Sequence, residues 1–159
     1  MAYYRPSIIK VNSPDFLSGA DLRLSDQGRE PLEVQYERIE NRERMANGRM
    51  RSKYIDDKRT FSLSWTMLPS KTLVNGSNVI MDGGASAADL KAFHESVYNE
   101  FTISVYADDR SELLSGAQVL DPEEVFGTYT VFFDSFSMTI NKRGRDFDFY
   151  DVEMTLEEA

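Results

Sequence analysis

The chain contains no cysteine and only one histidine, His94, among its 159 residues. The lack of cysteine excludes disulfide bonds, thiolate metal sites, iron–sulfur clusters and cysteine nucleophiles. A single histidine likewise excludes metal sites that need several imidazole ligands. No apolar run approaches the roughly 18 residues of a membrane-spanning helix, so we expect no membrane partner. The composition therefore offers little for catalysis or metal binding.

The residues that are present are typical of a folded, acidic domain. The chain has 27 acidic and 18 basic residues, for a formal charge of −9, and 41% of its residues are hydrophobic. Its 10 phenylalanines, 8 tyrosines and single tryptophan supply large side chains for a core. The length suits a single domain over residues 1–159. The negative charge argues against broad binding to nucleic acid, which needs a basic surface.

The clearest secondary-structure signal is a strict alternation over residues 59–68. Its apolar members are predicted to face the core: Phe61, Leu63, Trp65 and Met67. A weaker alternation over residues 32–39 predicts a partner strand. Asn47 and Gly48 lie between the two and predict a tight turn, because both residues tolerate a positive φ. We therefore expect a long β-hairpin over residues 32–68, with a basic, extended tip.

A helix is predicted over residues 87–98. Ser86 is a favourable N-cap, and Asp89 stands three residues later, where an acidic side chain completes a capping box. The apolar positions at helical spacing form one face, which we assign to the core: Leu90, Phe93 and Val97. Strands and helices do not alternate regularly in this pattern, which argues against a parallel α/β fold.

Further alternation predicts strands at residues 7–11, 101–106, 127–140 and 146–156. A turn at residues 108–109 and a polar connection over 111–122 are expected before the C-terminal strands, which occupy about 127–156 and end in a frayed tail. The apolar parity changes near Phe149 and Tyr150, which indicates a β-bulge in this strand or a strand buried on both faces. The expected fold is mainly β, an antiparallel β-sandwich or open barrel with one flanking α-helix and a long β-hairpin.

Each candidate for chemistry has a plainer structural interpretation. His94 lacks partners at metal-binding or catalytic spacing and is expected at the surface or at the edge of the core. The glycines before Ser86 fit helix entry better than anion binding, because no lysine follows at P-loop spacing. Several acids are expected to be solvated rather than catalytic or calcium-binding: Asp121, Glu123, Glu124, Asp146, Asp148, Asp151 and Glu153. We therefore assign no catalytic, cofactor-binding or metal-binding residue.

Charge is distributed unevenly along the chain. Residues 42–59 hold seven basic and three acidic side chains, whereas residues 121–159 hold ten acidic and three basic ones. A basic hairpin and an acidic body favour head-to-tail association of copies, although a merely solvated hairpin would show the same pattern. Nucleic-acid binding by the tip is disfavoured because no aromatic residues alternate with the bases. The expected subunit contacts are the bases around the tip: Arg42, Arg44, Arg49, Arg51 and Lys53.

Two stretches of the chain resemble tail proteins of tailed bacteriophages. The first covers residues 44–51 and continues at 58–65, and the second covers residues 129–133, 142–144 and 147–158. The order of the parts is also similar to the phage tail-tube fold, in which a long hairpin, a loop and one helix precede further strands.

This resemblance implies a structural virion protein without enzymatic activity or a cofactor. Tail-tube proteins form hexameric rings that stack into a tube, and DNA passes as transient cargo through a channel that is commonly acidic. Some acidic strand residues would then line the channel. The implied partners are further copies of the chain and other tail proteins, such as sheath, tape measure or baseplate. Assembly would take place in the cytoplasm of a host bacterium, and the protein would end in the virion tail.

Three alternatives stay open at this point. A distal tail or baseplate tube-initiator protein shares the fold and forms a single ring, so the sequence does not separate it from a tube subunit. A small ligand-binding β-sandwich module would instead be a monomer with a concave aromatic patch. An enzyme is the third alternative and would depend on His94.

Overall fold

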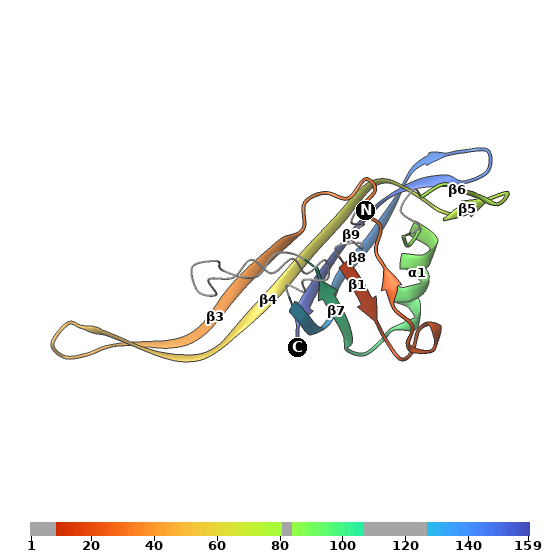
Figure 1. Ribbon diagram of the computed structural model, residues 1–159. Helices are drawn as coiled ribbons and strands as arrows, with labels where there is room; N and C mark the ends of the chain where they lie inside the picture. Colours follow the sequence, from red (N-terminus) through yellow and green to blue (C-terminus); the bar gives the residue numbers. More distant parts are fainter. Residues whose placement is uncertain (1–8, 81–83, 107–126) are drawn as a thin grey trace, which may run out of the picture.

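The computed structural model describes residues 9–80, 84–106 and 127–159, which are coloured in Figure 1. One seven-stranded antiparallel sheet has the strand order β2-β1-β7-β8-β9-β4-β3. Its strands are β1 (Ile9–Asn12), β2 (Leu22–Arg23), β3 (Glu33–Arg44), β4 (Met50–Pro69), β7 (Phe101–Val105), β8 (Gly127–Arg143) and β9 (Asp148–Glu158). The other elements are a small hairpin of β5 (Leu73–Val74) and β6 (Ser77–Asn78), a 3₁₀ turn, η1 (Leu17–Gly19), and the helix α1 (Ala87–Ser96).

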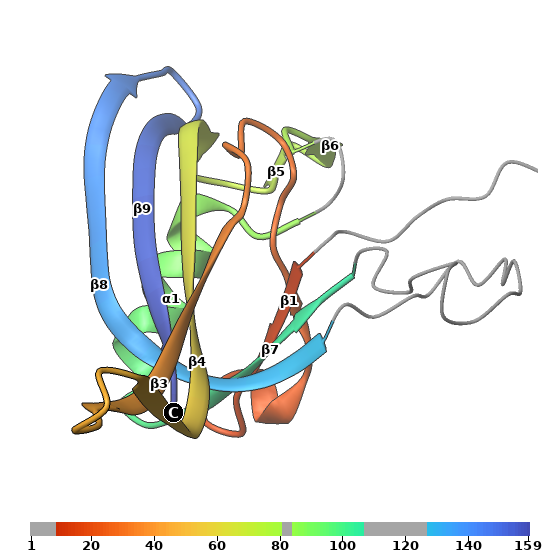
Figure 2. The ribbon, with the colours of Figure 1, turned by 90° about the vertical axis from the view of Figure 1, so that its left-hand side faces the viewer.

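The sheet is open and curved. Figure 2 shows β8 bending along its length, from the turn that joins it to β9 at one end to its pairing with β7 at the other. The two edge strands, β2 and β3, do not pair with each other, so the sheet does not close into a barrel. The mainly β, antiparallel fold with a flanking helix and a long hairpin is confirmed.

The long hairpin consists of β3 and β4, which pair from Glu33 and Ser62 out to Arg44 and Met50. Gly48 has a φ of +82° at the turn, a conformation that favours glycine. The Asn47 side chain accepts a hydrogen bond from the Arg49 backbone N–H at 3.0 Å. The turn chemistry visible in the sequence therefore sets the tip.

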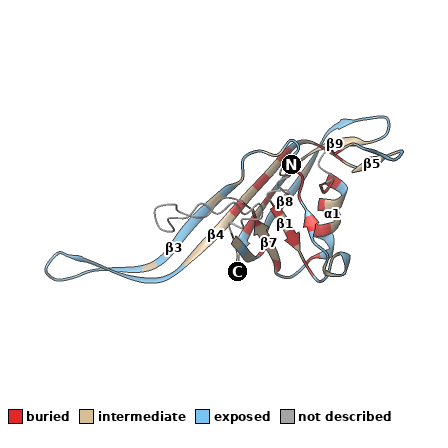
Figure 3. Cartoon of the chain, in the orientation of Figure 1, coloured by how far each residue is buried: buried red, intermediate tan, exposed pale blue. Residues whose placement is uncertain are grey.

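The core lies between α1 and one face of the sheet, where buried residues cluster in Figure 3. Phe93 of α1 meets three other rings edge-on, with centroids 5.3 Å from Phe16, 5.1 Å from Phe101 and 6.0 Å from Phe133. Burying an apolar side chain of this kind contributes about 1.5–3 kcal/mol. Among the buried side chains are six that the sequence assigns to the core: Phe61, Leu63, Trp65, Leu90, Phe93 and Val97.

The helix begins as its sequence indicates. The Ser86 hydroxyl accepts a hydrogen bond from the Asp89 backbone N–H at 3.3 Å, and the Asp89 carboxylate accepts one from the Ser86 backbone N–H at 3.0 Å. This capping box satisfies two backbone donors that the first turn leaves unpaired. The helix ends at Ser96, two residues earlier than expected, because Val97 has an extended backbone with φ −108°. Val97 is still buried.

The expected core position of Met67 is wrong. A β-bulge in β4 shifts the register between Trp65 and Leu68, so that Leu68 takes the buried position and Met67 is only half-buried. Met67 adopts a φ of +57° in this bulge. A strict period of two cannot continue through an extra residue, which moves every later side chain to the other face.

The bulge expected near Phe149 and Tyr150 lies in the neighbouring strands instead. β9 is continuous. The register shifts occur between Trp65 and Leu68 in β4, and at two places in β8, between Phe133 and Ser135 and between Ile140 and Lys142. β9 also pairs through Glu158 rather than fraying, and the Ala159 backbone N–H donates to Thr130 at 2.9 Å. The strands on either side of β9, β4 and β8, therefore contain bulges, whereas β9 itself is regular.

Several expectations fall outside the described residues. These are the turn at residues 108–109, the connection over 111–122, and the acids Asp121, Glu123 and Glu124. Ser7 and Ile8 of the first expected strand also lie outside, and β1 is observed from Ile9. Within the three described ranges, the structure contains no helix long and apolar enough to cross a membrane.

Candidate functional site

The outer part of the β3–β4 hairpin, residues 39–56, projects beyond the sheet in Figure 1 and forms what we call the arm. All but one of its side chains are exposed, as the pale blue colour in Figure 3 shows; the exception is the half-buried Glu40. The structure places the five candidate contact bases on this arm, and all are exposed: Arg42, Arg44, Arg49, Arg51 and Lys53.

Part of the charge on the arm is neutralised within the hairpin. The Ser52 hydroxyl donates a 2.6 Å hydrogen bond to Glu40, and Arg42 forms an ion pair with the same carboxylate. These two interactions lower the pKa of Glu40. Closer to the sheet, Arg38 lies 3.1 Å from Asp57, and this hydrogen bond raises the pKa of Arg38. Arg42 is therefore occupied, in contrast to the other four candidates.

The remaining four candidate bases make no ion pair with any described residue: Arg44, Arg49, Arg51 and Lys53. Large apolar side chains lie beside them. Met50 is 60% exposed and Met45 is 47% exposed at the tip, and Ile55 is 60% exposed further down β4. Unpaired cations combined with exposed apolar side chains are typical of a surface that binds another protein. Sequence reasoning singled out the bases but not the two methionines that flank the Asn47-Gly48 turn.

The root of the arm is fixed to the sheet by Arg59. Its guanidinium lies 5.4 Å from the ring centroid of Tyr36 and 4.7 Å from that of Tyr129, and it forms a 3.1 Å ion pair with Glu158. Beside it, the Lys58 ammonium donates to the Ala159 carbonyl at 2.5 Å. The end of the chain thus holds the base of the hairpin.

The face of the sheet opposite the core is polar. Pairing across β9 places Ser62 and Ser64 of β4 and Ser135 and Ser137 of β8 around the side chains of β9. The exposed carboxylates that β9 adds to this face are Glu153 and Glu157. A groove of about 350 Å³ on this face is lined by Glu153 together with Glu30 and Glu33. The α-helix lies on the other face, and no second helix covers this one in the described parts of the chain.

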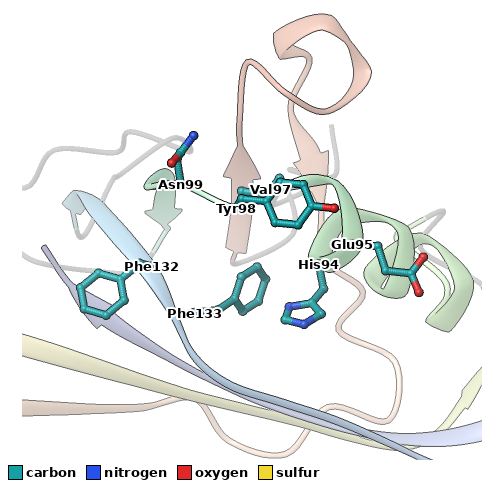
Figure 4. Close-up of a pocket in the computed structure, with 7 residues that line it drawn as sticks. All are labelled: His94, Glu95, Val97, Tyr98, Asn99, Phe132 and Phe133. Carbon is teal, nitrogen blue, oxygen red and sulfur yellow. The ribbon is translucent and has the colours of Figure 1, made fainter.

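A second groove, of about 500 Å³, lies between the end of α1 and the start of β8 (Figure 4). We call it the aromatic groove. Seven residues line it: His94, Glu95, Val97, Tyr98, Asn99, Phe132 and Phe133. These residues come from two segments more than thirty positions apart, so no local sequence pattern could reveal the groove.

His94 is a packing residue in this groove. Its ring stacks on Phe136 at 4.5 Å between centroids and meets Phe133 edge-on at 4.7 Å. Its buried Nδ1 has no hydrogen-bond partner among the described residues, and the same residues contain no cluster of metal-binding side chains. This arrangement fits the expectation of a histidine at the edge of the core.

Comparison with known proteins gives a likeness in structure. No protein-family model matches the chain, and no curated protein sequence matches it. A solved structure described as the tail of an empty gene transfer agent (GTA) particle with C6 symmetry matches with a TM-score of 0.51 and 9% sequence identity. The match covers 96% of this chain and 90% of that one. The fold of this chain is therefore similar to that of a chain in this tail structure. At this level of identity the likeness concerns the fold and assigns no residue a role.

Proposed function

We propose that this chain is a structural, non-enzymatic subunit of a phage-like tail, built as one tail-tube-like domain over residues 1–159 and acting without a cofactor. Six copies form a ring, and rings stack into a tube through which DNA passes. The observation that carries the proposal is the arm, which extends beyond the sheet with unpaired cations and exposed apolar side chains. Exposed apolar side chains beside unpaired cations are typical of a surface that binds another protein, as the subunits of an assembly do.

The fold adds three further supports. Tail structures with this fold include one of C6 symmetry, and the likeness extends over almost the whole of both chains. The polar face of the sheet, with Glu153 and Glu157 among hydroxyl side chains, suits the wall of a channel. Carboxylates repel the phosphate backbone, so DNA would pass along such a wall without adhering. β3 is an edge strand of the sheet that the described residues form, so the sheet of another copy can continue there.

The oligomeric state of the purified protein tests this proposal. Sedimentation analysis combined with negative-stain electron microscopy should find rings or tubes with a central hole, built from 18.2-kDa subunits. A monomer at every concentration, also after other tail proteins are added, would contradict the proposal. Long tubes would favour a tube subunit, and single rings that never stack would favour a distal tail or baseplate initiator.

The aromatic groove favours a second candidate, a ligand-binding β-sandwich module. Tyr98 presents an exposed ring at this hollow, and Phe133 lines it, as such a module requires. This candidate predicts a monomer whose tyrosine and tryptophan fluorescence changes when a small apolar or saccharide ligand is added. Assembly into rings without any such ligand would exclude it.

A further inference from the structure

Two asparagines of the chain are followed by glycine: Asn47 in the turn of the arm and Asn75 in the turn between β5 and β6. This dipeptide is chemically labile, because glycine has no Cβ to keep its backbone nitrogen away from the preceding side-chain amide. We propose that Asn75 is a site of spontaneous deamidation in the folded protein, whereas Asn47 is protected by its turn. The inference does not depend on the proposed function.

The reaction needs only the chain and water. The backbone nitrogen of Gly76 loses its proton and attacks the side-chain carbonyl carbon of Asn75, and the side-chain nitrogen leaves as ammonia. Water then opens the resulting cyclic imide at either of its two carbonyl groups. One opening gives aspartate, and the other gives isoaspartate, in which the backbone runs through the former side chain. Neither an oxidant nor a reductant is consumed.

The reacting groups are free at the turn between β5 and β6. Asn75 and Gly76 both have a positive φ, +50° and +79°, as in a type I′ turn, and Val74 pairs with Ser77 across it. Within the described parts of the chain, the Gly76 N–H donates no hydrogen bond and the Asn75 side-chain amide makes none. Both residues are exposed. The attacking nitrogen and the amide that it attacks are therefore both in contact with water.

The same groups are hydrogen-bonded at the turn of the arm. The Gly48 N–H donates to the Met45 carbonyl at 2.9 Å, and the Asn47 side-chain oxygen accepts from the Arg49 N–H at 3.0 Å. A third bond, from the Met45 N–H to the Arg49 carbonyl at 2.8 Å, closes the turn. The first two bonds must break before Gly48 can attack. The dipeptide is the same at both sites, so its hydrogen bonding makes the difference.

The β5–β6 hairpin also costs little free energy to open. Each strand has two residues, and the pair forms a sheet of its own, extended by one bond from the Val79 N–H to the Thr72 carbonyl at 2.9 Å. A two-stranded hairpin of this kind is marginally stable, so it samples the open conformations that ring closure needs. The turn of the arm instead closes strands of 12 and 20 residues, at the opposite end of the molecule in Figure 1.

Deamidation would change both the charge and the backbone at this turn. The product carries a carboxylate where Asn75 was neutral, in a chain whose formal charge is already −9. The isoaspartate form adds a methylene to the backbone, which the two-residue turn between Val74 and Ser77 cannot accommodate without losing their pairing. The modification therefore loosens the β5–β6 hairpin. The seven-stranded sheet stays intact, because the hairpin lies outside it.

Peptide mapping of the purified chain tests the inference, at a protein concentration too low for copies to associate. After incubation in mildly alkaline buffer, mass spectrometry should find Asn75 converted about tenfold faster than Asn47, the factor given by a difference of about 1.4 kcal/mol in the cost of freeing the reacting groups. An isoaspartate-specific methyltransferase should label the peptide that contains Asn75. In urea the two sites should react at similar rates, because both turns are lost.

The control variant is Asn75→Gln, whose longer side chain would have to close a larger ring. It should abolish the labelling at this turn, leave the conversion of Asn47 unchanged and preserve the circular dichroism spectrum. Equal conversion of Asn47 and Asn75 in the folded chain would overturn the inference. Conversion of Asn75 in urea but not in the folded chain would overturn it as well, since the type I′ turn would then be protective. Each of these results leaves the proposed function untouched.

Discussion

At the scale of single residues, the carboxylate of Asp151 bridges two β-bulges of the sheet, one in β4 and one in β8. Its carboxylate accepts a 3.1 Å hydrogen bond from the Met67 backbone N–H in the bulge of β4. On the other side it accepts bonds of 3.0 and 3.1 Å from the Asn141 amide in the bulge of β8. The sequence indicated a solvated strand acid at this position. The structure instead gives this carboxylate a bridging position between two strands.

These hydrogen bonds, led by the one from Met67, lower the pKa of Asp151. A carboxylate whose folded pKa is depressed stabilises the fold above its unfolded pKa, about 3.9 for aspartate, and this stabilisation is lost as the pH falls through the folded pKa. The variant Asp151→Asn should therefore melt at a lower temperature than the natural chain at pH 7. The difference should shrink as the pH falls through the folded pKa of Asp151, which lies below the unfolded value, because the protonated carboxyl is as neutral as the asparagine side chain.

Thermal melts followed by circular dichroism between pH 2.5 and 8 would check this prediction. Glu153→Gln is the matched control, because Glu153 is an exposed carboxylate two residues further along the same strand. It should follow the curve of the natural chain. A parallel curve for Asp151→Asn at all pH values would show that the bridge contributes no charge-dependent stability.

At the scale of a single strand, substitutions at two adjacent residues test where the bulge in β4 lies. Leu68 is fully buried whereas Met67 is half-buried, so Leu68→Ala should lower the free energy of unfolding by about 2–5 kcal/mol. Met67→Ala should cost clearly less, because the side chain loses few contacts. Chemical denaturation of the two variants measures both values. A larger loss at Met67 would mean that the alternation continues unbroken.

A feature of the fold could be predicted from the sequence when the residues that cause it lie close together in the chain. The capping box of α1 and the turn at Gly48 are set by residues within a few positions, and the sequence contains them in full. The bulge at Met67 depends on how β4 pairs with β9, over eighty residues away, and the period of two gives no sign of it. The aromatic groove combines α1 and β8 and was missed for the same reason.

At the scale of the whole molecule, reversing the charge of the arm tip should impair assembly while the fold stays intact. Each exposed ion pair contributes roughly 0.2–1 kcal/mol. Losing two of them at every subunit contact should raise the concentration required for assembly about tenfold, since about 1.4 kcal/mol corresponds to that factor. The variant is Arg49→Glu with Arg51→Glu, and sedimentation against concentration is the measurement.

The variant also changes the net charge of the protein, so a control with the same change in net charge is needed. Arg23→Glu with Lys71→Glu alters the total charge by the same amount at exposed positions outside the arm. This control should assemble like the natural chain. Equal impairment of both variants would attribute the effect to general repulsion and remove the specific role of the arm.

The strand β4 spans 20 residues, and one end of it lies in the core while the other forms half of the arm. The same backbone that is held at the tip is therefore held by β9 over the segment from Thr60 to Pro69. A pull along the arm acts parallel to this strand and perpendicular to its inter-strand hydrogen bonds. It loads those bonds in shear, so that they resist together instead of opening one after another. Tension between copies would thus be carried by the part of β4 whose side chains lie in the core of each subunit.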